Sequence, residues 1–112
     1  MELAKKECKP CEGGTPPLKG QALRQMQEDL KDGWRVVNEE RLEREFKFPD
    51  FRQTLGFVNR VGEIAEQQNH HPDICFTYGR ARIQIWTHKI NGLSENDFIL
   101  AAKISKLNPT KA

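Results

Sequence analysis

The chain has 112 residues, enough for one domain with a hydrophobic core and too few for two. Hydrophobic residues make up 37% and charged residues 30%, which is typical of a globular protein and excludes a disordered chain. The net charge of +2 is spread over interspersed acidic and basic residues, so nucleic-acid binding is not indicated. Apolar runs are short and the start lacks a long apolar segment; we therefore expect no membrane span, no secretory signal and a cytoplasmic location.

Residues 1–17 are rich in Lys, Gly and Pro and are expected to form a flexible N-terminal tail before a domain at residues 18–112. Cys8 and Cys11 lie in this tail, and the chain has three cysteines in all. An odd number argues against a disulfide framework and favours reduced thiols. The Cys8–Cys11 spacing matches half of a zinc-ribbon pattern, but no second pair follows, so two free thiols are the favoured interpretation.

The first part of the domain is predicted to contain a helix and two strands. The helix begins at Leu18 and ends at Gly33, because apolar residues recur on one stripe: Leu23, Met26 and Leu30. Two β-like segments follow, at residues 34–38 and 42–48. In the second, alternating residues share one mostly apolar face: Leu42, Arg44, Phe46 and Phe48.

An amphipathic helix is predicted next, with Asp50 as its N-cap and Pro72 as its limit. Its apolar residues recur at helical spacing: Phe51, Leu55, Val58, Val61 and Ala65. Two further strands, at residues 74–78 and 81–88, are joined by a tight turn, and a last helix opens at Ser94. The expected fold is α+β, with the order α-β-β-α-β-β-α and a four-stranded antiparallel sheet that packs its helices on one face.

The three histidines, His70, His71 and His88, are candidates for acid–base chemistry, because imidazole exchanges protons near neutrality. Three such rings in one cleft would suit a reaction that removes one proton and supplies another. Glu66 lies four residues before His70 and could orient that ring on a continuing helix. The alternative interpretation is a capped helix end, with His88 as a surface strand residue.

Zinc binding and helix capping are two further interpretations of residues in this region. The three imidazoles and Cys75 could bind zinc, but adjacent histidines point in different directions and no HxxxH or HxH spacing is present. No metal site is therefore predicted. Asp97 stands in a capping-box pattern with Ser94, which explains the residue without a catalytic role.

Several segments together resemble the pterin-4a-carbinolamine dehydratases. They are Glu66 to Pro72, Tyr78 before a turn with Arg80, Thr87-His88, and Gly92-Leu93-Ser94 followed by Asp97. The resemblance runs from about Leu18 to Leu107, which is nearly the whole expected domain. Its motifs are specific, because His-His-Pro with a later Thr-His and a Gly-Leu-Ser helix start is not a generic pattern.

The resemblance implies a hydro-lyase that converts a 4a-hydroxytetrahydropterin to quinonoid dihydropterin and water, and so recycles the tetrahydropterin of aromatic amino acid hydroxylases. It implies catalytic roles for His70, His71 and His88, pterin-binding roles for Glu66 and Asp97, and no metal or organic cofactor. It also implies a homodimer or homotetramer. A second function stays open, because the family includes dimerisation cofactors of a transcription factor and relatives linked to Rubisco assembly; these are non-catalytic binding modules.

Three positions depart from the family pattern. Ile74 stands where the family usually has a tryptophan, and Cys75 follows where an aromatic residue is common. Asn96 stands where an arginine commonly precedes the matching aspartate. The tryptophan change is expected to affect pterin stacking or the wall of the cleft, and with it substrate preference, whereas the histidine set is retained.

Overall fold

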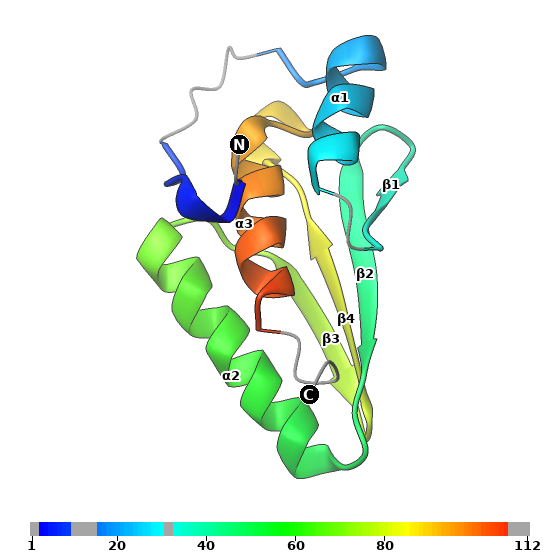
Figure 1. Cartoon of the computed structure of the whole chain (residues 1–112), viewed down its shortest axis with the longest axis vertical. Helices are drawn as coiled ribbons and strands as arrows, with labels where there is room; N and C mark the ends of the chain where they lie inside the picture. Colours follow the sequence, from blue (N-terminus) through cyan, green and yellow to red (C-terminus); the bar gives the residue numbers. More distant parts are fainter. Residues whose placement is uncertain (1–2, 10–15, 31–32, 108–112) are drawn as a thin grey trace.

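The computed structural model describes residues 3–9, 16–30 and 33–107 (Figure 1). The elements in chain order are η1 (Leu3–Lys5), α1 (Gly20–Leu30), β1 (Arg35–Val37), β2 (Arg41–Lys47), α2 (Phe51–Gln68), β3 (Asp73–Thr77), β4 (Arg80–Ile85), η2 (His88–Ile90) and α3 (Glu95–Ser105). The predicted α+β fold and its order of helices and strands are confirmed. Two short 3-10 helices, η1 and η2, were not predicted.

The four strands form one antiparallel sheet in the order β1-β2-β4-β3, with α1, α2 and α3 on one face (Figure 1). The central strand β4 supplies the middle of the core. Its alternate residues Ala81, Ile83 and Ile85 are fully buried, as the two-residue period of a strand with one covered face requires. Phe46 of β2 lies opposite Ala81 and continues the same apolar layer.

The helix α2 begins as predicted, with Asp50 accepting a hydrogen bond from the backbone N–H of Gln53. The predicted apolar stripe is wrong in its first half, because Phe51 and Leu55 are 44% and 39% exposed. The helix instead buries Thr54 and Phe57 in this half, together with the predicted Val61 and Ala65 in the other.

Thr54 explains why the buried face of α2 differs from the predicted one. Its hydroxyl donates to the carbonyl of Asp50 at 2.8 Å and accepts from the backbone N–H of Gly79 at 3.1 Å. A buried hydroxyl with both partners in place is not penalised, so a polar residue occupies the core face. The same contact ties the β3–β4 turn to the start of α2.

The described part of the expected N-terminal tail, residues 3–9, contacts the helices of the domain. Residues 3–9 lie beside α3 and the C-terminal end of α2, with Leu3 buried in the core at 6% exposure (Figure 1). Lys103 of α3 donates from Nζ to the carbonyl of Ala4 at 2.8 Å. Apolar burial and polar contacts together offset the entropy lost on ordering this segment. Cys11, whose role was also predicted, lies outside the described residues.

The outer face of the sheet carries charged residues that pair with one another. Glu43 accepts from Gln84 Nε2 and from Arg35, each at 2.8 Å. The hydrogen bond from Gln84, with help from Arg35, holds the pKa of the Glu43 carboxyl below its ordinary range.

No helix in the described parts of the chain is long and apolar enough to cross a membrane.

Candidate active site

All three histidines line one pocket of about 390 Å³. His70 and His71 reach it from the segment that follows α2, and His88 reaches it from η2, just after β4. Cys8 and Lys9 of the N-terminal segment line the same pocket. The structure therefore brings together the three imidazoles that the sequence predicted would share a cleft.

The end of α2 sets the directions of the two adjacent histidines. Asn69 follows the last helical residue with φ 53° and ψ 41°, and its N–H bonds to the carbonyls of Ala65 and Glu66. Asparagine tolerates this left-handed conformation better than most residues, so the helix ends here cleanly. Because the helical conformation ends at Asn69, His70 and His71 are not on the helix, and they contact different carboxylates.

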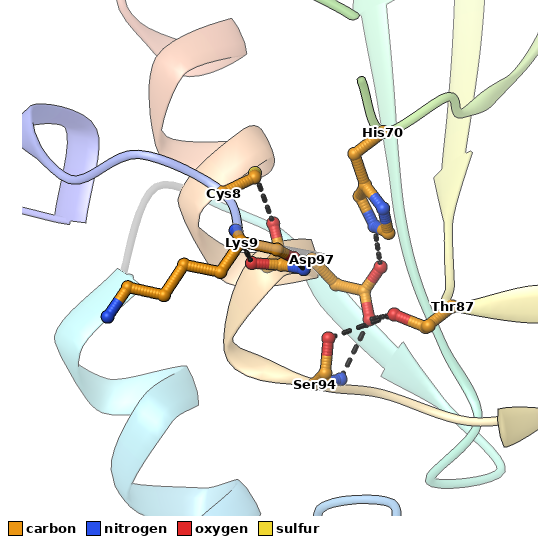
Figure 2. Close-up of polar contacts among 7 residues, drawn as sticks. Cys8, Lys9, His70, Thr87, Ser94 and Asp97 are labelled. Carbon is orange, nitrogen blue, oxygen red and sulfur yellow. Dashed lines mark hydrogen bonds and ion pairs between the residues drawn. The ribbon is translucent and has the colours of Figure 1, made fainter. Parts of the chain in front are cut away.

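His70 pairs with a buried carboxylate. Its Nε2 lies 2.6 Å from Asp97 Oδ1, and the two side chains are 13% and 0% exposed. Figure 2 shows the imidazole of His70 pointing at this carboxylate, which projects from the first turn of α3. A fully buried carboxylate is stable only when donors surround it, and His70 is one of three.

The other two donors come from the segment between β4 and α3. Asp97 Oδ2 accepts from Thr87 Oγ1 and from the backbone N–H of Ser94, each at 2.8 Å (Figure 2). The capping-box interpretation of Ser94 and Asp97 is therefore correct but incomplete. One carboxylate oxygen caps α3 while the other holds His70. The sequence signal could not reveal this second contact, because His70 lies 27 residues away along the chain.

Glu66 pairs with His71, not with His70 as the sequence predicted. The distance from His71 Nε2 to Glu66 Oε2 is 2.6 Å. The prediction assumed a helix that continues to His70, whereas the left-handed Asn69 ends it. The side chains of His71 and Glu66 are 55% and 78% exposed, so this pair lies in water. We therefore expect it to be weaker than the buried pair.

His88 is held by ring stacking. The predicted strand through His88 ends at Ile85, and Thr87 instead forms an isolated bridge with Gly92. The His88 ring stacks on Trp86 with centroids 4.5 Å apart and an interplanar angle of 10°. The guanidinium of Arg41 lies over the same indole at 4.8 Å. Trp86 also lines the pocket, a role that the sequence reasoning missed.

The sequence matches known proteins over almost all of its length. The family profile described as Pterin 4 alpha carbinolamine dehydratase matches residues 16–107. A relative from Rubrobacter xylanophilus that carries the family's name is 60% identical over 106 residues, which cover 95% of this chain and 98% of the relative. The chain belongs to the pterin-4a-carbinolamine dehydratase family.

A second relative and a solved structure agree with this assignment, and another solved structure shares the fold. A relative from Alkaliphilus metalliredigens with the same name is 46% identical over 104 residues, covering 93% of this chain and 94% of the relative. The crystal structure of a transcriptional coactivator/pterin dehydratase from Brucella melitensis is similar with a TM-score of 0.76 and 31% identity, over 82% of this chain and 98% of that one. A pterin dehydratase-like protein described as a RuBisCO assembly factor of the alpha-carboxysome shares the fold, with a TM-score of 0.61 at 23% identity over 71% of this chain and 94% of that one.

The structure locates the three departures from the family pattern. Ile74 and Cys75 lie on β3, and neither is among the residues that line the pocket. Asn96 does line it, and contacts the backbone of Lys9. The departure that affects the pocket is therefore Asn96.

Within the described residues, no three His, Cys, Asp or Glu side chains are arranged to hold a metal ion.

Proposed function

We propose that this member of the dehydratase family catalyses the dehydration of a 4a-hydroxytetrahydropterin to quinonoid dihydropterin and water. One observation carries the proposal: the buried pair of His70 and Asp97 lies at a pocket that His71 and His88 also line. Acid–base groups held by a buried partner beside a pocket of substrate size are typical of catalytic sites.

The reaction needs two proton transfers that balance. A proton is delivered to the 4a-hydroxyl oxygen as the C4a–O bond breaks, and water leaves. A base takes the proton from N5 as the C4a=N5 double bond forms, so that no proton is gained or lost overall. Imidazoles perform both steps near neutral pH, which makes a metal or organic cofactor unnecessary.

His70 is the imidazole with the best support for one of these transfers. We assign Nε2 of His70 as the donor to the Asp97 carboxylate, which leaves Nδ1 as the ring atom that exchanges a proton. The carboxylate fixes this tautomer and stabilises the imidazolium that forms when the ring takes a proton. We assign the complementary transfer and the positioning of the pterin to His71 and His88.

The proposal is tested by the rate of dehydration of a 4a-hydroxytetrahydropterin, followed by absorbance with the wild type and without protein. We expect the wild type to exceed the spontaneous rate and the triple variant His70→Ala/His71→Ala/His88→Ala to match it. A wild-type rate equal to the spontaneous one would refute the proposal. A folded protein of that kind would fit the alternative, a non-catalytic binding or assembly module.

We further propose that the protein forms a homodimer or homotetramer. β3 is an edge strand of the sheet. On β3, in the turn after it and on α2, large apolar side chains are exposed: Phe51, Leu55, Phe76 and Tyr78. An open edge with exposed apolar residues favours pairing with a second copy. Sedimentation should show an oligomer for the wild type and a smaller species for Phe76→Glu; a wild-type monomer would contradict this.

A further inference from the structure

Side chains of α2 and α3 hold the N-terminal segment, residues 3–9, along its length. Leu3 is buried in the core at one end. Near the other end, Gln68 Oε1 accepts from the backbone N–H of Cys8 at 2.8 Å, and Gln68 Nε2 donates to Glu7 at 3.0 Å. Because backbone groups make part of these contacts, the attachment of the segment does not depend only on exposed charge pairs, which contribute little to stability.

Asn96 makes the most specific of these contacts. Its Oδ1 accepts from the backbone N–H of Lys9 at 2.9 Å, and its Nδ2 donates to the carbonyl of Lys9 at 2.5 Å. A primary amide offers one acceptor and donors as a peptide group does, so this reciprocal pair copies the exchange between two paired strand residues. Asn96 is only 8% exposed, and loss of its amide would leave the Lys9 backbone groups without these partners.

The residues that hold the segment adjoin the residues of the buried pair. Asn96 directly precedes Asp97, and Gln68 lies two positions before His70. Figure 2 shows Cys8 and Lys9 beside the first turn of α3, next to the carboxylate that holds His70. Cys8, Lys9, Gln68 and Asn96 all line the pocket together with the three histidines. The end of the N-terminal segment, Cys8 and Lys9, is therefore part of the pocket surface.

We propose that Cys8 and Lys9, at the end of the N-terminal segment, form a fixed wall of the substrate pocket. Asn96 and Gln68 are the positioning residues that hold this wall in place and are called the latch. The identity of the ligand as a pterin rests on the proposed function. The proton-transfer pair does not depend on the latch, because Asp97 is held by Thr87 and Ser94. Loss of the latch should therefore weaken pterin binding and leave the chemical step intact.

Steady-state kinetics of the Asn96→Ala/Gln68→Ala variant test the latch. We expect KM to rise about tenfold while kcat stays within about twofold of the wild type, the pattern of lost binding rather than lost chemistry. Gln67→Ala, an exposed neighbour on the same helix, is the matched control and should leave both constants unchanged. An unchanged KM in the double variant, or a loss confined to kcat, would overturn the proposal.

A thiol-protection experiment tests the wall without relying on turnover or on the latch variants. In a Cys11→Ser/Cys75→Ser protein, Cys8 is the remaining thiol, and a stable dihydropterin should slow its alkylation about tenfold at saturation. In a Cys8→Ser/Cys11→Ser protein, the exposed Cys75 on β3 should react at the same rate with and without pterin. If tryptophan fluorescence shows that the pterin binds but Cys8 is not protected from alkylation, the proposed wall is refuted. Failure of the pterin to bind would instead refute the proposed function.

Discussion

The Asp97→Asn variant is expected to lose about 10²–10⁴-fold in kcat and about 1–3 kcal/mol in the free energy of unfolding. The neutral amide keeps the hydrogen bonds from Thr87 and Ser94 only by turning its NH2 group toward His70, so Nε2 of His70 must then accept, and the hydrogen bonds to a charged acceptor become neutral ones. It also fails to stabilise a charged His70 ring or to fix its tautomer. Both effects follow from a carboxylate with no exposed surface.

Two measurements separate the effects of this substitution. Stopped-flow kinetics give kcat, and urea unfolding gives the free energy of unfolding at the same pH. Asp29→Asn makes the same charge change on the exposed surface of α1 and should leave kcat unchanged. An Asp97→Asn protein that is folded and retains wild-type kcat would remove Asp97 from the account of catalysis.

The second large effect is expected from combining substitutions of His70 and Asp97. His70→Ala should lower kcat by about 10²–10⁴-fold. The double variant His70→Ala/Asp97→Asn should be no more than about threefold slower than the slower of the two single variants, because residues that act as one unit lose their function once. The measurement is kcat for the wild type, both single variants and the double variant under one set of conditions.

The exposed pair of His71 and Glu66 provides the matched comparison for this cycle. Its ring and carboxylate approach to the same 2.6 Å but lie largely in water. We expect Glu66→Gln to change kcat by less than about fivefold, since exposed ion pairs contribute about 1 kcal/mol or less. The roles of the two pairs would be reversed if the kcat losses for His70 and Asp97 multiplied in the double variant while the losses for His71 and Glu66 were strongly coupled.

Most of the fold could be predicted because periodicity reports which face of an element is buried. The alternation of Leu42 and Phe46 identified the inner face of β2, on which both side chains are buried. The α2 stripe could not be placed by the same rule, because Thr54 is buried through satisfied hydrogen bonds while Phe51 stays exposed. Hydrophobicity reports the average preference of a residue type and not its particular partners.

The sequence predicted the shared cleft of the three histidines, but not their partners. The pair of His70 and Asp97 depends on how the end of α2 meets α3, and Glu66 was matched with His70 because the left-handed turn at Asn69 was not foreseen. Capping of α3 explained Asp97 sufficiently, so spacing offered no reason to look further. Long-range contacts of this kind leave no local pattern.

The N-terminal segment shows a similar limit. The Lys-, Gly- and Pro-rich composition of residues 1–17 predicted a flexible tail and gave no indication of the contacts that Gln68 and Asn96 make with Cys8 and Lys9. Such contacts pair side chains with backbone groups and have no periodic signal in either partner. The departure at Asn96 was visible in the sequence, but its contact with the backbone of Lys9 required the fold.

His70, held by Asp97, is proposed to exchange a proton with a pterin in this pocket. A crystal structure with a bound stable dihydropterin would show whether the two groups meet. We expect the C4a–N5 edge to lie about 2.6–3.2 Å from Nδ1 of His70, directly or through one water. A pterin bound elsewhere, or one whose C4a–N5 edge faces away from His70, would contradict it.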